Sequence, residues 1–211
     1  MSRRSWPVAC GAIKNSAIFV FMGNPLITYL QLFRPITAED QGLIASYFKP
    51  AVFKEGDTLF RGGKICQEMF FVCNGILRIL ATNEKGVEVT HFFVKENQLC
   101  TILHSFNNQV PAEESIQAAC DTEVLAITKA RLLDLYGQIS YLKELIDQIT
   151  QQRLLDKIQT RNAYLGEDSV GRYKLFIMQH PDIALRVPLK DIASYLGITP
   201  QSLSRIRKKI K

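Results

Sequence analysis

The spacing of apolar and polar positions divides the chain into stretches with different patterns, and the pattern of the first stretch is helical. Between residues 24 and 48, apolar side chains recur three or four positions apart, as they do on one face of a helix. Pro35 interrupts the pattern, and Thr37 is suited to cap a second helix ahead of Glu39 and Asp40. We therefore expect two short helices in this stretch.

The stretch from Phe53 to Ile127 has the pattern of β-structure. Short apolar runs, rich in β-branched and aromatic residues, alternate with turn signals such as Glu55-Gly56-Asp57 and Asn74-Gly75. Regularly spaced strands with glycine turns predict a sandwich or a small barrel. The predicted strands are Thr58 to Phe60, Met69 to Val72, Ile76 to Leu80, Val87 to Val94 and Val124 to Ile127.

The region from Leu132 to Leu165 is strongly helical, with almost no glycine or proline. Its apolar residues fall three and four apart and form one narrow stripe, which a long helix can bury against a twin or against its own β-domain. The pattern favours the twin. The residues expected at this dimer interface are Leu142, Leu145, Ile149, Leu155 and Ile158. Three shorter helices are predicted after it, over Ser169 to Gln179, Leu189 to Leu196 and Pro200 to Ile210.

Positive charge is concentrated at the C-terminal end. From Arg186 to Lys211 there are seven cations and a single anion, Asp191, so this segment carries the whole formal net charge of +6. Such a concentration suits a module that binds a polyanion, although charge alone also fits a solvated tail.

Residues 189–210 have the pattern of a helix-turn-helix. Ala193 is small where a second helix must approach closely, and Gly197 can adopt the positive φ of a helix C-cap. Thr199 is a good N-cap, and Pro200 fits the first position of the next helix. Leu203 and Ile206, three positions apart, would turn that helix back into the core.

The outward residues of the predicted second helix have the chemistry that reads a DNA groove. Glutamine can pair with the adenine edge, and arginine can pair with O6 and N7 of guanine. Lysine and arginine at the helix end suit phosphates, which position a protein without specifying sequence. The candidate DNA-binding residues are Thr199, Gln201, Ser202, Ser204, Arg205, Arg207 and Lys208.

Other classes of protein find little support in the sequence. No apolar run is long enough for a membrane span, and no nucleophile motif, phosphate loop or metal-ligand spacing occurs, so neither an enzyme nor a metal site is expected. The five cysteines are odd in number and lack a C-x-x-C pair, which favours reduced thiols in the cytoplasm. Residues 1–21 are interpreted as an N-terminal extension, with Met22 as an alternative start of translation.

At this point the chain resembles the CRP/FNR family, the regulators related to the cyclic AMP receptor protein. Besides the helix-turn-helix, the resemblance rests on residues 53–60, residues 70–79 and the long helix leading to residues 171–176. It implies an α+β protein with a cyclic-nucleotide-binding-type β-roll (a jelly roll), a long dimerisation helix and an all-α DNA-binding domain. The expected boundaries are 1–21 for the extension, 22–136 for the β-roll, 137–166 for the dimerisation helix and 167–211 for the helix-turn-helix domain.

The resemblance also implies partners. Members of this kind are homodimers that bind double-stranded DNA in the cytoplasm, and RNA polymerase is a further candidate partner. Gln201, Ser202 and Arg205 match the base-contacting positions of the family's recognition helix. Two protomers would then read half-sites about 34 Å apart on one face of the DNA.

The sequence departs from the family where a cyclic nucleotide would bind. Nucleotide-binding members hold the ribose and phosphate with a Gly-Glu and an Arg-Ala pair, whereas residues 96–118 contain neither, and Glu113 and Glu114 add negative charge there. Gating by cyclic AMP is therefore not expected, and an unknown small-molecule effector is left open. An iron-sulfur cluster is not expected either, because only Cys10 lies near the N-terminus. The candidates for lining an effector pocket are His104, Glu114, Ser115 and Gln117.

A second interpretation stays open beside the DNA-binding one. The β-roll would then be a ligand-sensing module whose basic tail binds protein or RNA rather than specific DNA.

Overall fold

The computed structural model describes residues 23–210. The predicted extension over residues 1–21, the alternative start at Met22 and the last residue, Lys211, lie outside the described residues. The two N-terminal helices are confirmed as α2 (Pro25–Leu30) and α3 (Ala38–Tyr47). Thr37 caps α3 as predicted, because its side chain accepts a hydrogen bond from the backbone N–H of Asp40.

Two antiparallel four-stranded sheets form the β-roll, with strand orders β1-β8-β3-β6 and β2-β7-β4-β5. Apolar side chains from both sheets, among them Phe70, Leu77 and Ile116, meet in a buried core between them. The expected α+β fold with a jelly-roll-like domain is therefore confirmed. The strands are β1 (Lys49–Phe53), β2 (Thr58–Phe60), β3 (Glu68–Asn74), β4 (Leu77–Thr82), β5 (Glu88–Val94), β6 (Leu99–Cys100), β7 (Ser115–Ala118) and β8 (Thr122–Thr128).

Four elements of this region were not predicted from the sequence. β1 lies at a sheet edge, where Pro50 is tolerated, and β6 is only two residues long. β7 alternates buried and half-buried residues over four positions, too few for a clear period. The remaining element is the short helix α4 (Leu103–Asn108), which has no side-chain hydrogen bond at its N-cap.

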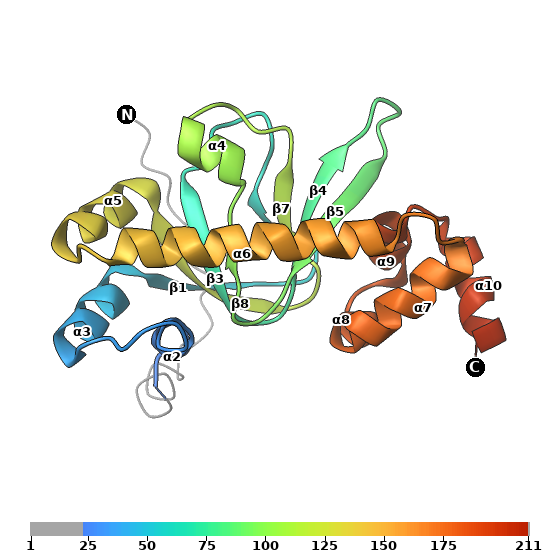
Figure 1. Cartoon of the computed structure of the whole chain (residues 1–211). Coiled ribbons are helices and arrows are strands. Elements are labelled where there is room, and N and C mark those ends of the chain that lie inside the picture. The colour runs from blue at the N-terminus through green and yellow to red at the C-terminus, as the bar shows by residue number, and fades with distance from the viewer. Residues whose placement is uncertain (1–22, 211) are drawn as a thin grey trace.

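The predicted helix from Leu132 to Leu165 is two helices, α5 (Lys129–Gln138) and α6 (Leu142–Ala163). The chain leaves helical geometry at Ile139, which caps α5 in an extended conformation and is itself buried. Figure 1 shows α6 crossing the β-roll and ending beside the C-terminal helices. Its first half packs into the apolar core of its own chain, whereas its second half leaves Leu154, Leu155 and Ile158 about half exposed.

That division corrects part of the expected dimer interface. Leu142, Leu145 and Ile149 are at most 4% exposed and belong to the core that α6 shares with α2, α3, α5 and the β-roll. Because these side chains are already buried within their own chain, they have no surface left for a partner. Leu155 and Ile158 are 53% and 48% exposed and remain available.

Four helices complete the described part of the chain: α7 (Ser169–Gln179), α8 (Pro181–Arg186), α9 (Leu189–Leu196) and α10 (Pro200–Ile210). Three of them have the predicted bounds. The sequence analysis did not predict α8, in which Pro181 occupies the first turn, where a proline is well tolerated. The four helices share a third apolar core, which also includes Ile76 and Ala119 from the β-roll.

Candidate DNA-recognition surface and its contact with the β-roll

The turn between α9 and α10 has the geometry of a helix-turn-helix. Gly197 ends α9 with a φ of +67°, in the left-handed region that favours glycine. The N–H of Gly197 bonds to the carbonyl of Ser194, and the N–H of Ile198 bonds to that of Ala193 at 3.0 Å. This pair of bonds is a Schellman motif, which satisfies the last carbonyls of α9 and turns the chain sharply.

The two helices pack through small and apolar residues. Ala193 is fully buried, and Leu203 and Ile206 of α10 lie in the same core as Ile192 and Leu196 of α9. Close approach at Ala193 and a buried stripe on α10 fix which side of α10 faces outward.

The outward face of α10 carries most of the candidate DNA-binding residues. Gln201, Arg205 and Lys208 are exposed and follow one another at helical intervals of four and three. Arg207 is also exposed, and together with Ser204, Lys208 and Leu189 it lines a hollow of about 200 Å³ beside the start of α9.

Two of the candidates are engaged within the turn itself. The hydroxyl of Thr199 accepts a hydrogen bond from the backbone N–H of Ser202 at 3.1 Å and donates to the Ser202 hydroxyl at 2.9 Å. Thr199 therefore acts as the N-cap of α10, and Ser202, which is half-buried, flanks the outward face.

A buried arginine joins this helix-turn-helix to the β-roll. Arg78 of β4 forms an ion pair with Asp191 of α9 at 2.8 Å, and their side chains are 5% and 8% exposed. The same guanidinium donates to Glu88, Gln117 and Thr90, so it is well supplied with acceptors. Burial raises the pKa of Asp191, and the Arg78 charge opposes that rise.

Two further ion pairs and a hydrogen-bonded serine hold the same contact. Lys95, just after β5, pairs with Asp182 of α8 at 2.8 Å, and Glu96 pairs with Arg186 of α8 at 2.6 Å. The Ser194 hydroxyl of α9 accepts a hydrogen bond from the Thr90 N–H and donates to the Glu88 carbonyl. Sequence reasoning missed this contact; its one signal was Arg78, a charge inside an otherwise apolar strand.

The residues proposed for an effector pocket are not brought together. Ile116 and Ala118 of β7 face the core of the β-roll, so Ser115 and Gln117 point to the opposite face. Gln117 there accepts a hydrogen bond from Arg78 at 2.7 Å, and Ser115 accepts one from the N–H of Gly62. The expectation that they line one pocket with Glu114 and His104, which is exposed on α4, is therefore not supported.

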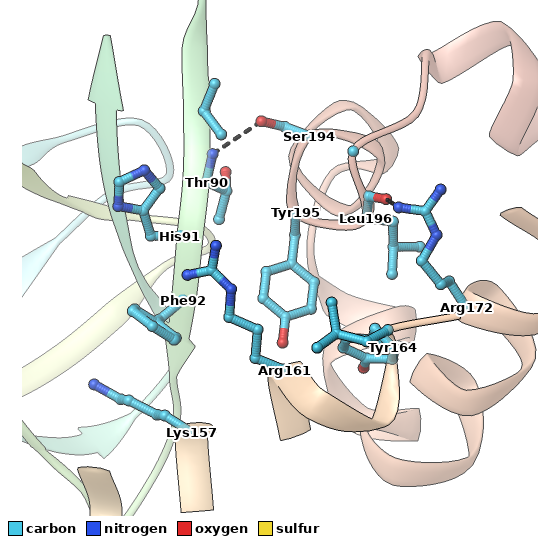
Figure 2. Close-up of a pocket in the computed structure, with 13 residues that line it drawn as sticks. Thr90, His91, Phe92, Lys157, Arg161, Tyr164, Arg172, Ser194, Tyr195 and Leu196 are labelled. Atoms are coloured by element: carbon cyan, nitrogen blue, oxygen red, sulfur yellow. Dashed lines mark hydrogen bonds between the residues drawn. The ribbon is translucent and has the colours of Figure 1, made fainter. Parts of the chain in front are cut away.

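A cavity of about 460 Å³ lies instead between the β-roll and the helix-turn-helix. Figure 2 shows its walls: β5 on one side, the last turns of α6 below, and α9 on the other side. The β-roll candidates His104, Glu114, Ser115 and Gln117 do not line it. Its lining is Val89, Thr90, His91, Phe92, Lys157, Arg161, Tyr164, Leu165, Arg172, Ser194, Tyr195, Leu196 and Gly197.

Two negative findings apply to the described residues only. Residues 23–210 contain no group of three or more histidine, cysteine or acidic side chains that could hold a metal ion. No helix in this part of the chain is both long and apolar enough to cross a membrane.

Comparison with known proteins shows which proteins this chain is similar to. Residues 50–138 match the family of cyclic nucleotide-binding domains. The cyclic AMP receptor protein of Thermus thermophilus is 22% identical over 179 residues, which cover 83% of this chain and 82% of that protein.

Solved structures share the fold over most of the chain. A Eubacterium rectale protein described as a transcriptional regulator of the CRP/FNR family superposes with a TM-score of 0.66 at 18% identity, covering 86% of this chain and 87% of that one. The c-di-GMP responsive global regulator of Xanthomonas campestris gives a TM-score of 0.64 at 16% identity and covers 82% and 91%.

The chain is thus a cyclic nucleotide-binding-type β-roll joined to a C-terminal helix-turn-helix. Over most of its length it is similar to a cyclic AMP receptor protein and shares the fold of a CRP/FNR-family transcriptional regulator, in line with the resemblance seen in the sequence.

Proposed function

We propose that this protein is a homodimeric regulator that recognises a specific DNA sequence in the major groove with α10. The observation that carries the proposal is the outward face of α10, where Gln201, Arg205 and Lys208 are exposed at helical spacing opposite the buried Leu203 and Ile206. Such a face combines side chains that read base edges with a cation suited to phosphate. A regulator of this kind acts where the DNA is, in the cytoplasm.

The second half of α6 is proposed as the dimer interface. Leu154, Leu155 and Ile158 are 49%, 53% and 48% exposed on a helix that otherwise bears polar residues there. Burying this surface against a twin helix removes it from water and places two recognition helices on one duplex. Leu155 and Ile158 are retained from the set expected from sequence.

The test of DNA recognition begins with the preferred duplex selected from a random library. Arg205→Ala should weaken binding to that duplex by about 1–3 kcal/mol and relax base preference at one position, because a bidentate contact is lost. Arg61→Ala is the matched control, since Arg61 is also exposed but lies in the β-roll, before β3. Equal losses on preferred and scrambled duplexes would instead indicate non-specific attraction by charge.

The same selection separates the DNA-binding proposal from the alternative. If no duplex sequence is enriched and the protein retains only salt-sensitive binding to any polyanion, the basic tail serves a protein or RNA partner. Enrichment of a two-fold symmetric site would support a dimer that reads two half-sites.

Gating by cyclic AMP is not part of the proposal. Residues 96–118 hold no arginine, and Arg78, the buried arginine nearest in the sheet to β7, is already paired with Asp191 and Glu88. The Arg78 guanidinium is therefore not free to receive a phosphate. Calorimetry with cyclic AMP should show no binding at millimolar ligand, whereas clear micromolar binding would contradict this interpretation.

A further inference from the structure

An arginine from α7 supports the turn between the two helices of the helix-turn-helix. The Arg172 guanidinium donates to the carbonyl of Leu196, the last residue of α9, at 2.8 Å (Figure 2). The bonds of the Schellman motif end on the carbonyls of Ala193 and Ser194, so Arg172 satisfies a carbonyl that the motif does not reach. A cation at this end of α9 also lies where the helix dipole favours positive charge.

The same side chain lies against Gly197, the residue at which the chain turns. A Cβ atom at position 197 would lie 3.5 Å from Nη1 of Arg172, which is ordinary van der Waals contact. Glycine can adopt many backbone conformations, so its own backbone restricts the turn less than another residue would. A guanidinium that packs on the turn from another helix supplies part of that restriction.

Arg172 itself extends from a well-anchored helix. The Asp168 side chain caps α7 by accepting a hydrogen bond from the N–H of Gly171 at 2.7 Å. Tyr173 and Phe176 bury the inner face of α7 in the core that it shares with α9 and α10. The half-buried Arg172 side chain therefore connects the turn to a fixed part of the same domain.

The stability of the fold does not by itself account for this arginine. Its Nε atom is buried and has no hydrogen-bond partner within residues 23–210, and its guanidinium forms no ion pair with a carboxylate of these residues. A buried donor without an acceptor costs free energy. Proteins retain such local costs mainly at functional sites.

From this arrangement we propose that Arg172 is a positioning residue for DNA recognition, which fixes the angle between α9 and α10 through the Leu196 carbonyl. The inference rests on the proposed role of α10 in reading DNA. Arg205 lies more than one helical turn beyond Pro200, so a small rotation at the turn displaces its guanidinium from a base edge. A bidentate contact tolerates little displacement, because two hydrogen bonds must align at once.

The first experiment compares binding to the preferred duplex with binding to a scrambled duplex at one salt concentration. Arg172→Met removes the charge and the donors but keeps an apolar stem. It should weaken binding to the preferred duplex by about tenfold and to the scrambled duplex by less than about twofold. Arg172→Lys keeps the charge and a donor, and it should recover part of the specific affinity without the planar fork.

Ile183→Val is the matched control, since Ile183 is 3% exposed in the same core but belongs to α8 rather than to the turn. It should lower the thermal unfolding midpoint and leave the ratio of the two dissociation constants unchanged. If that ratio falls as far in Ile183→Val as in Arg172→Met, loss of stability explains the effect and the proposal is wrong. Equal weakening on both duplexes would also overturn it, because a lost phosphate contact acts on every sequence alike.

Hydrogen exchange in the absence of DNA tests the turn itself. The N–H groups of Gly197 and Ile198 are bonded in the Schellman motif, and in Arg172→Met they should exchange about tenfold faster than in the unmodified protein. Unchanged exchange at these two amides would overturn the proposal. If the unmodified protein selects no duplex, the proposed function of α10 fails, whereas the exchange result still shows whether Arg172 holds the turn.

Discussion

A single buried arginine links the two halves of this molecule. Arg78 stands between Leu77 and Ile79, which face the core of the β-roll, so its own side chain points to the opposite face, where α9 lies. Its bond to Asp191 joins residues 113 positions apart in the chain. Breaking a buried ion pair by removing one partner is costly, because the other charge is left in a place with little water.

Asp191→Asn should therefore destabilise the protein. The loss can reach about 3–5 kcal/mol for a buried pair, and we expect roughly 2–3 kcal/mol because Arg78 keeps three other acceptors. Urea unfolding measures this loss as a decrease in the free energy of unfolding. Asp147→Asn is the matched control, since Asp147 pairs with Lys143 on the surface of α6, where the expected loss is under about 0.5 kcal/mol. Similar losses of unfolding free energy in the two variants would show that the buried Arg78–Asp191 pair stabilises the protein no more than a surface pair does.

The roles of single residues could be predicted from the sequence where they depend only on neighbouring residues, as in helix capping. Thr37, Gly197 and Thr199 were assigned as caps, and the structure places each of them in that role. The Arg78–Asp191 pair was not foreseen, because nothing in a one-dimensional pattern states which strand meets which helix. In the sequence, Arg78 is only one position of a predicted strand, and Asp191 is only the single anion of the basic C-terminal segment.

At the scale of elements, α6 performs two different tasks along its length. The sequence predicts one narrow apolar stripe with a break at Gln152, and the structure places Leu145 in the core of its own chain while Ile158 is about half exposed. The spacing of apolar residues identifies the apolar face of a helix, but it does not show which part of the protein packs against that face. The same limit explains why short elements such as β6 and α4 were missed, since they span too few residues for any period to appear.

The exposed half of α6 gives the test of dimerisation. Ile158→Glu would place a charge in the proposed interface and should raise the dimer dissociation constant by about a hundredfold, which corresponds to roughly 3 kcal/mol. Sedimentation velocity should show the dimer giving way to monomer, with an unchanged circular dichroism spectrum because the side chain is not part of the core. Leu133→Glu, at a leucine of α5 that is 55% exposed, should leave the dimer intact. If Ile158→Glu remains dimeric, the dimer interface lies elsewhere on the protein.

At the scale of the whole molecule, the order of parts was predictable and their arrangement was not. Strand-rich, helical and basic segments follow one another in the sequence, and this order indicated a sandwich or small barrel, a long helix and a helix-turn-helix, while the β-roll was implied by the family resemblance. The docking of α8 and α9 on β5 depends on ion pairs and ring contacts between distant segments, such as Lys95 with Asp182 and Phe93 with Tyr195. The cavity at this contact forms only where distant segments of the chain pack together, so no sequence motif predicts it.

The contact between the β-roll and the C-terminal helices should weaken in acid, starting with His180 at the junction of α7 and α8. Burial lowers the pKa of His180 from its ordinary value of 6.5, the nearby Lys95 lowers it further, and Asp182 opposes them. A base with a depressed pKa favours the fold in its neutral form. Its contribution is therefore present above pH 6.5 and is lost as the pH falls through the folded pKa.

Two carboxylates of the same contact extend this loss to lower pH. Burial alone would raise the pKa of Glu96 and of Asp182, but hydrogen bonds from Arg186 and Lys95 respectively, together with backbone N–H groups, leave both below their ordinary values. Their contributions are present above those values, 4.5 and 3.8, and disappear only as the pH falls further.

Thermal unfolding as a function of pH can separate the histidine from the carboxylates. Between about pH 7.5 and about pH 5.5 the unfolding midpoint should fall, and His180→Gln should remove most of that fall, since the carboxylates stay ionised in this window. His104→Gln is the control, because His104 is exposed on α4, away from the C-terminal helices. A fall that persists in His180→Gln would mean that the acid-sensitive group lies elsewhere. The contact would then depend on its ion pairs and apolar packing, and should weaken only where Glu96 and Asp182 become protonated.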